Sequence, residues 1–286
     1  MPNNTIAILL ATYNSSKYIR EQIDSLLSQT YKDFIIYVRD DCSTDKTPII
    51  LQDYKNRYPE RFVIVDNEGK SLRAYHNFVE LMYKVESPYY MFCDHDDVWL
   101  SDKIEVSMAR MQQESLNHTD KPIIVHTDMM VVDQNLNIIN ESFWSYTKLL
   151  PKHVRFKDLV CCNSVNGCTV LLNNKAKQVA LQNVDNATMH DMLVAQSVAA
   201  NGGIVAAVMQ PTVLYRQHID NVVGAHERNR EYYIKKAHNL KAVWKDNINW
   251  WQMSRRIRKY SFLSYMLTKV KINMIKILKY KVGIGM

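Results

Sequence analysis

The sequence predicts an α/β protein whose mostly parallel sheet is flanked by helices, with a helical extension at the C-terminus. Short apolar runs of strand length alternate with amphipathic segments over much of the chain. Polar clusters directly follow several of these runs, as at the ligand-binding edge of open α/β sheets. With 286 residues, 47% of them hydrophobic, the chain is long enough for one large core and an appendage. We therefore expect a core domain over residues 1–225 and a helical region over residues 226–286.

The first half of the chain predicts four strands joined by three helices. The strands are expected at 5–11, 34–38, 62–65 and 87–92, and the helices at 17–29, 45–58 and 72–85. The first strand is an apolar run, which is typical of a parallel strand buried on both faces. Asp45 or Thr44 is placed to cap the second helix. Strand–helix–strand units have right-handed crossovers, so these strands should lie parallel.

The second half of the chain is less regular. Further strands are expected at 123–130, 168–172, 204–208 and 212–216, and a helix at 191–200. Residues 133–157 are irregular and aromatic, and a loop of this length is usually a functional lid or disordered. The small residues of 166–169 would let a ligand lie close to the backbone, although a simple turn explains them equally well.

Charge and cysteine usage exclude several classes of protein. Nine Lys or Arg residues and no acidic residue lie between 247 and 286, which leaves 27 basic against 29 acidic residues in the remainder. The net charge of +7 therefore belongs to the tail and does not indicate a nucleic-acid-binding protein.

The five cysteines are odd in number and lack zinc-ligand spacing, so we expect thiols in a reducing cytoplasm. No signal-peptide pattern and no apolar stretch of about 18 residues is present, so no membrane-spanning helix is expected.

The most informative segment is the acidic cluster from Asp94 to Asp97, which follows the strand expected at 87–92. Three carboxylates in four residues repel one another, and each raises the pKa of the others unless a cation neutralises them. At the carboxyl end of a strand in an α/β sheet, we expect that cation to be Mg²⁺ or Mn²⁺, which usually brings a phosphate. The alternative is a solvated acidic turn with a cap for the helix that begins at Asp102.

Two familiar nucleotide-binding patterns are absent, because the chain has neither G-x-x-x-x-G-K-[ST] nor G-x-G-x-x-G. Four other motifs occur in order, which are Ala11-Thr12-Tyr13-Asn14, Asp40-Asp41-Cys42-Ser43-Thr44-Asp45, Asp94-His95-Asp96-Asp97 and Arg216-Gln217-His218. Together they resemble the family 2 inverting glycosyltransferases of GT-A fold, the Rossmann-like fold of nucleotide-diphospho-sugar transferases. The resemblance covers about residues 5–224, with Cys42 replacing the usual glycine of D-D-G-S-T-D. The segment from Asp94 to Trp99, together with His190-Asp191 and Arg216-Gln217-His218, looks most like the rhamnosyltransferase-like subgroup. His190-Asp191 stands where the family usually has Glu-Asp.

The resemblance implies a set of nucleotide-binding residues, which comprises Ala11, Tyr13, Asp41, Arg73, Asp94 and His95. Tyr13 would stack on the base, and Asp41 would accept a hydrogen bond from the base N–H that uracil and thymine both offer. Asp94 would contact the ribose or the metal. Arg73 lies near the position of a base-side or phosphate-binding arginine, with a solvated helix face as the alternative. For the pair Asp40 and Asp41, the alternative is a turn plus a helix cap.

The resemblance also implies metal ligands and a catalytic base. Asp96 would bind Mn²⁺ or Mg²⁺ directly, with Asp97 next, and His218 would approach the metal or diphosphate from the opposite side. Asp191 would act as the general base, because the acceptor hydroxyl must lose its proton as it attacks the sugar. His190 would tune Asp191 or point outward. An N-cap for the helix that follows is the alternative role of Asp191.

These residues predict a metal-dependent inverting glycosyltransferase of bacterial surface polysaccharide biosynthesis. The donor is expected to be a dTDP- or UDP-linked rhamnose or hexose, and the acceptor a hydroxyl of a lipid-linked saccharide or another glycan. One alternative is a sugar-nucleotide pyrophosphorylase, whose glycine-rich basic loop is not visible near the start. The other is a non-catalytic nucleotide-sugar-binding or scaffold protein, against which the intact Asp96 and Asp191 argue.

The segment 260–281 has strong helical periodicity. Seven apolar side chains share one face, namely Leu263, Met266, Leu267, Val270, Met274, Ile277 and Leu278. Lys269, Lys276 and Lys279 lie on the other face, with Lys271 at its edge. A basic amphipathic helix is typical of a peripheral element on an anionic membrane surface, here the inner face of the cell membrane. The alternative is a helix docked on its own domain or on a second subunit of a homo-oligomer.

Overall fold

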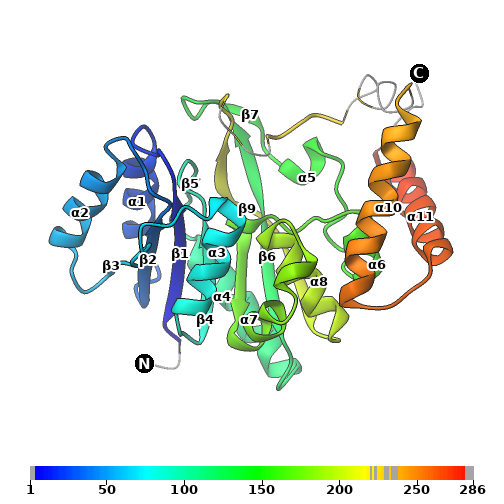
Figure 1. Ribbon diagram of the computed structural model, residues 1–286, viewed down its shortest axis with the longest axis horizontal. Coiled ribbons are helices and arrows are strands. Elements are labelled where there is room, and N and C mark those ends of the chain that lie inside the picture. Colours follow the sequence, from blue (N-terminus) through cyan, green and yellow to red (C-terminus); the bar gives the residue numbers. More distant parts are fainter. Residues whose placement is uncertain (1–3, 220, 222–223, 229–231, 233–237, 281–286) are drawn as a thin grey trace.

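One mixed sheet organises the structure, a computed structural model that describes residues 4–219, 221, 224–228, 232 and 238–280 (Figure 1). Among these residues the sheet has the order β3-β2-β1-β4-β8-β6-β9-β5, with β7 paired to β6. The strands are β1 (Ile6–Thr12), β2 (Phe34–Asp40), β3 (Phe62–Ile64), β4 (Tyr89–Cys93), β5 (Val98–Trp99), β6 (Ile123–Val132), β7 (Ile138–Asn140), β8 (Val170–Asn173) and β9 (Ile204–Arg216).

Helices flank both faces of the sheet, as predicted (Figure 1). The helices of the sheet region are α1 (Ile19–Leu27), α2 (Thr47–Arg57), α3 (Arg73–Lys84), α4 (Lys103–Asn117), α7 (Asn174–Leu181) and α8 (His190–Ala200). Alternate side chains of β1 enter two separate cores, because successive residues of a strand point to opposite faces. Ile8 packs with α1, α2 and α4 on one face. Leu9 packs with α3, α7 and α8 on the other.

The first four strands bring the predicted site together at one edge of the sheet. β1 pairs in parallel with β2 and with β4, and β2 pairs in parallel with β3. In this register Thr12 lies opposite Asp40, and Leu10 lies opposite Cys93. The carboxyl ends of β1, β2 and β4 are therefore neighbours, and the polar turn after each one lies at the same edge.

The second half of the sheet departs from the prediction in two ways. β8 is inserted between β4 and β6 and is antiparallel to both. The two strands expected at 204–208 and 212–216 are one strand, β9, which runs parallel to β6. Its register shifts where Thr127 pairs with Val208 and Asp128 pairs with Pro211. The break expected between residues 208 and 212 is therefore an irregularity within one strand.

Residues 133–157 are more ordered than the expected lid or disordered loop. They contain β7 and the short helix α5 (Phe143–Tyr146), and they lead into α6 (Phe156–Cys161). Trp144 is buried, and its indole N–H donates to the backbone oxygen of Ser164 at 3.0 Å. The Asp128 carboxylate accepts hydrogen bonds from the Ser142 hydroxyl and from the Trp144 backbone N–H. The aromatic side chains therefore contribute to the core.

Two helices close the described chain, α10 (Leu240–Ile257) and α11 (Phe262–Tyr280), and they lie side by side at the end of the sheet opposite α2 (Figure 1). Tyr265 of α11 packs with Phe156 and Val160 of α6 in a third hydrophobic cluster. Within the described residues, every helix is too short or too polar to cross a bilayer. The division at residue 225 remains a prediction.

Candidate active site

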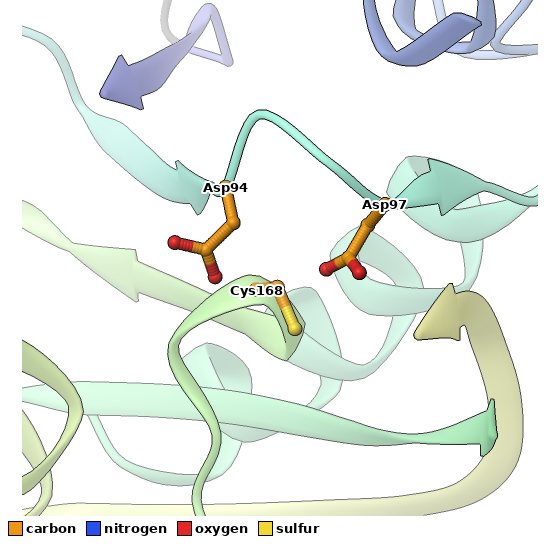
Figure 2. A group of neighbouring side chains, drawn as sticks. All are labelled: Asp94, Asp97 and Cys168. Carbon is orange, nitrogen blue, oxygen red and sulfur yellow. The ribbon is translucent and has the colours of Figure 1, made fainter. Parts of the chain in front are cut away.

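The acidic turn connects β4 to β5, and two of its carboxylates, those of Asp94 and Asp97, lie close together. Figure 2 shows Asp94 and Asp97 directed toward Cys168, which lies in the short 3₁₀ helix Gly167–Thr169. One ligand atom from each of these three residues lies within 4.8 Å of the others. Asp97 is fully buried, and its Oδ1 accepts a hydrogen bond from the Arg216 backbone N–H at 3.1 Å. Within the described residues, its Oδ2 has no hydrogen-bond partner, although the Cys168 thiol lies close to the carboxylate.

Burial dominates the electrostatics of this turn. It raises the pKa of Asp94 to about 7, with smaller contributions from the negative charges of Asp96 and Asp191. Burial likewise raises the pKa of Asp97 well above its usual range, again helped by the neighbouring carboxylates. A carboxylate that is desolvated and close to like charges is unstable in its ionised form. The turn therefore favours a bound cation or protons.

One buried cation lies beneath the turn, at the start of α4. Lys103 is fully buried, and its ammonium lies 4.6 Å from the centre of the Trp99 ring. Burial lowers its pKa to about 8, while Asp97 and the two nearby cysteines oppose this change. Within the described residues, its Nζ has no hydrogen-bond partner. Lys103 thus offsets part of the negative charge, but it does not occupy the acceptor positions of Asp97.

Asp96 points to the other side of the turn, where it meets His218. Its Oδ2 accepts a hydrogen bond from His218 Nε2 at 2.8 Å. Arg216 supports this side, since its Nε donates to the Asp96 backbone oxygen at 2.8 Å and its guanidinium lies 4.6 Å from the Tyr18 ring centre. The ring of Tyr18 also lies 5.0 Å from that of His218. Two predicted metal ligands, far apart in sequence, are therefore in contact.

The donor set of the turn fits a hard divalent cation. Three carboxylates and one imidazole supply oxygen and nitrogen atoms of the kind that bind Mg²⁺ or Mn²⁺. Burial raises the pKa of the Cys93 and Cys168 thiols well above the usual value, which disfavours the thiolate form that a soft metal requires. A cation would also satisfy the Oδ2 atom of Asp97, which lacks an N–H or O–H donor in the described part of the chain.

Asp191 lies in the first turn of α8 and faces this cluster. It is 9% exposed, and burial raises its pKa to about 7. Its Oδ1 accepts from the Met192 backbone N–H at 2.6 Å, and its Oδ2 accepts from Asn163 Nδ2 at 3.4 Å. The N-cap of α8 is Met189, so the alternative role of Asp191 as the N-cap is wrong. A carboxylate with a pKa near 7 is well matched to general base catalysis at neutral pH.

The turn after β2 has the opposite character. Asp40 accepts hydrogen bonds from the hydroxyls of Thr12 and Ser43 and from the Ser43 backbone N–H. Asp41 accepts four hydrogen bonds, and its donors are Arg39 Nη1, Ser71 Oγ and the backbone N–H groups of Leu72 and Arg73. Burial acts against these bonds, but the net effect lowers the pKa of Asp41. A base N–H would reach Asp41 only by displacing one of these donors.

The remaining predicted nucleotide-binding residues lie around the same edge. Tyr13 is 54% exposed just after β1, as a stacking platform requires. Ala11 is buried within β1 opposite Arg39, so only its backbone and methyl group are available there. Arg73 begins α3 with a φ of +62°, held by the hydrogen bond from its N–H to Asp41. His95 is half-buried within the acidic turn.

Comparison with known proteins decides the family. The Glycosyl transferase family 2 profile matches residues 7–171, which is more than half of the chain. The matched residues include the turns after β1, β2 and β4 and the segment of Cys168. The chain belongs to glycosyl transferase family 2.

Several individual proteins resemble this family 2 member. The dTDP-rhamnosyl transferase RfbG of Shigella flexneri is 27% identical over 226 residues, which cover 76% of this chain and 74% of that protein. The putative teichuronic acid biosynthesis glycosyltransferase TuaG of Bacillus subtilis is 22% identical over 249 residues, which cover 84% of this chain and 92% of that protein. S. aureus TarS 1-349 in complex with UDP-GlcNAc superposes with a TM-score of 0.62 at 15% identity, covering 97% of this chain and 73% of that chain. The chain spans 37% of the longer S. aureus TarS structure. The fold is therefore GT-A.

Two departures from the family motifs have local explanations in the structure. Cys42, in place of the usual glycine, has a φ of +63°, a conformation that glycine adopts without a steric cost. His190, in place of the usual glutamate, points inward and not to solvent. Its ring lies 4.0 Å from that of Phe78, and a Cβ atom on Gly167 would meet its Nε2 at 2.0 Å. The glycine of segment 166–169 therefore makes room for His190.

The neutral state of His190 limits its role in this family 2 site. Burial lowers its pKa to about 3, so the imidazole carries no charge at neutral pH. It therefore supports the start of α8 by packing and does not stabilise ionised Asp191 by charge.

Sequence reasoning missed Lys103, Tyr18 and Asn163, which border the acidic turn and the candidate base Asp191. Each belongs to a common residue type in an ordinary local context, and only spatial proximity to Asp97, His218 or Asp191 distinguishes it.

Proposed function

We propose that this protein is a metal-dependent inverting glycosyltransferase that transfers a sugar from a nucleoside-diphosphate donor to an acceptor hydroxyl. The observation that carries the proposal is the position of Asp191, a buried carboxyl with a pKa of about 7 close enough to raise the pKa of Asp94. A base at this place can take a proton from a hydroxyl held beside the donor site. Inversion follows from a direct attack of that hydroxyl on the sugar carbon.

The other residues of the site would have separate roles. Asp94, Asp96 and Asp97 would hold Mn²⁺ or Mg²⁺, with His218 on the opposite side. The bound ion would stabilise the negative charge that develops on the departing nucleoside diphosphate. Asn163 donates to Asp191 and would keep its carboxylate directed at the acceptor. Tyr13, exposed beside Asp41, would stack on the base.

We infer that the donor is a dTDP- or UDP-sugar, with dTDP-rhamnose favoured and UDP-hexoses next. The name of RfbG, a dTDP-rhamnosyl transferase, supports rhamnose, and the name of TuaG supports a role in a bacterial surface polysaccharide. The acceptor would be a lipid-linked saccharide or another glycan. The enzyme would work in the cytoplasm at the inner face of the cell membrane, where lipid-linked acceptors are made.

Nucleoside-diphosphate release from a panel of dTDP-, UDP- and GDP-sugars would test this function. We expect release from a dTDP- or UDP-sugar only when acceptor and Mn²⁺ or Mg²⁺ are present. Full activity in excess chelator would contradict the role of the metal, and a clear preference for GDP would contradict the roles of Tyr13 and Asp41. A pyrophosphorylase would instead form a nucleotide sugar from a sugar phosphate and a nucleoside triphosphate. A scaffold protein would bind the nucleotide without turnover.

A further inference from the structure

The helix α11 is docked by the face that the sequence predicted to be polar. Tyr265 and Ile272 on this face are fully buried, and Lys276 is buried beside them. The Tyr265 hydroxyl donates to Asn247 Oδ1 at 2.9 Å, and the Tyr280 hydroxyl donates to the Leu149 backbone oxygen at 2.7 Å. These contacts attach α11 to α10 and to the domain, so docking of the helix does not use its apolar stripe.

The apolar stripe of α11 faces solvent. Six of its residues have between 43% and 76% of their surface exposed to solvent, namely Leu263, Leu267, Val270, Met274, Ile277 and Leu278. Met266, which was expected in the stripe, instead packs against the third hydrophobic cluster. The remaining positions recur every three or four residues over the length of the helix, so they form one continuous strip. A continuous exposed apolar strip on a folded protein usually marks a binding surface.

A basic pocket adjoins this strip at the N-terminal half of α11. The pocket has a volume of about 850 Å³ and lies between α6, the link from α10 to α11, and α11 itself. Its cationic lining residues are Arg155, Lys157, Arg258, Lys259 and Lys271. Arg155 pairs with the buried Asp158, and Lys157 donates to Ser264 Oγ. In the described part of the chain, the other three cations have no carboxylate partner within 4 Å. Leu267 lines both the pocket and the strip.

The charges on this surface select its partner. Between 247 and 286 the sequence has nine basic residues and no acidic residue, so two copies meeting through α11 would bring cations against cations. Interface centres between proteins are also depleted of charge. An anionic bilayer offers the complementary arrangement, with phosphates at the surface and hydrocarbon just below it. Since no described helix is able to cross a bilayer, α11 would lie along its surface.

We propose that α11 and the pocket at Arg258, Lys259 and Lys271 form a docking surface for an anionic lipid bilayer. A lipid phosphate would enter the pocket, and the strip that includes Leu267 would enter the boundary between headgroups and acyl chains. This inference extends the proposed membrane location of the enzyme. Its test does not depend on turnover, so a failure would leave the transferase proposal intact.

Co-sedimentation with vesicles tests this surface in the full-length protein. We expect binding to vesicles of phosphatidylglycerol and phosphatidylethanolamine, little binding to phosphatidylcholine alone, and weaker binding as salt rises. The variant R258Q/K259Q/K271Q should bind on the order of 100-fold more weakly, because each cation near an anionic surface contributes roughly a factor of five. The control K32Q/K121Q/K175Q removes the same charge away from the pocket and should bind like the wild type.

A second variant separates the apolar strip from the charges. L267Q/V270Q/M274Q replaces exposed side chains, so its thermal melt should match the wild type while its vesicle binding falls at least tenfold. L116Q, at a leucine of α4 that is 84% exposed, is the matched control and should bind normally. The proposal would be overturned if R258Q/K259Q/K271Q bound vesicles as tightly as the wild-type protein does. It would also be overturned if the wild-type protein bound phosphatidylcholine vesicles as tightly as it binds vesicles that contain phosphatidylglycerol. A dimer in sedimentation velocity that the strip variant dissociates would also overturn it in favour of a second copy.

Discussion

Two acidic turns lie at the same edge of the sheet, one after β2 and one after β4 with β1 between them, and they use the same residue type in opposite ways. In the first, hydrogen bonds lower the pKa of Asp41 and hold that of Asp45 well below its usual range, against the effect of burial. In the second, burial and mutual repulsion raise the pKa of Asp94 to about 7 and hold that of Asp97 well above its usual range. The two turns therefore differ in the number of donors available to their carboxylates and not in the residue type.

The largest effect should come from the second turn and its partner base. Asp191→Asn should lower kcat by on the order of 10²–10⁴, the usual contribution of a general base, and change donor affinity little. Asp96→Asn should abolish turnover while the fold survives, because Asp96, in contact with His218, is a proposed metal ligand. Steady-state kinetics with a titration of dTDP binding checks both variants. Asp185→Asn, at an exposed acid in the same region, is the control, and a wild-type rate in Asp191→Asn would mean that the base lies elsewhere.

The first turn should instead respond in stability. Asp41→Asn weakens four hydrogen bonds to a buried carboxylate, so we expect the free energy of unfolding to fall by about 2–4 kcal/mol. Chemical denaturation at pH 7 measures this loss. Asp97→Asn, measured alongside without metal, should not be destabilised, because it removes a charge that burial already disfavours. Equal destabilisation by both variants would remove the distinction between the turns.

The pH dependence of stability should have opposite signs in the two turns. The pKa of Asp94 rises from 3.8 to about 7 on folding, so its contribution to stability falls as pH rises from about 4 to 7. Asp94→Asn should therefore match the wild type near pH 4 and exceed it by on the order of 2 kcal/mol at pH 8, in chelator. The pKa of Asp41 is lowered, so its contribution is present above pH 3.8 and is lost on acidification. Denaturation curves from pH 3 to 8 give both slopes, and parallel slopes would contradict the assignment.

The smallest effect should come from the backbone of the first turn. Cys42→Gly relieves a φ of +63° and should raise the free energy of unfolding by about 0.5–1 kcal/mol. Cys42→Ala keeps the Cβ atom and should give no comparable gain. A thermal melt compares the two variants, and identical melting temperatures would show that the turn carries no such strain.

The sequence predicted those parts of the protein that depend on local pattern. Apolar periodicity located β1, β2, β4 and the helices between them, because a strand or helix buries one face by a fixed repeat. The motifs at Asp40–Asp45 and Asp94–Asp97 predicted which turns gather at one edge of the sheet, since polar residues that follow neighbouring parallel strands lie close together. The family and the GT-A fold follow from these motifs, and the comparisons confirm both.

The tertiary structure decided what depends on contacts between distant residues. β8 pairs in antiparallel between β4 and β6, a choice that strand periodicity does not contain. Lys103 and His190 are buried because the space beneath the acidic turn and beside Gly167 accepts them. Periodicity found both faces of α11, but only packing on α6 decided that Tyr265 is buried and the leucine strip is exposed. A repeat defines the faces of an element, whereas the surface that the rest of the chain presents determines which face is buried.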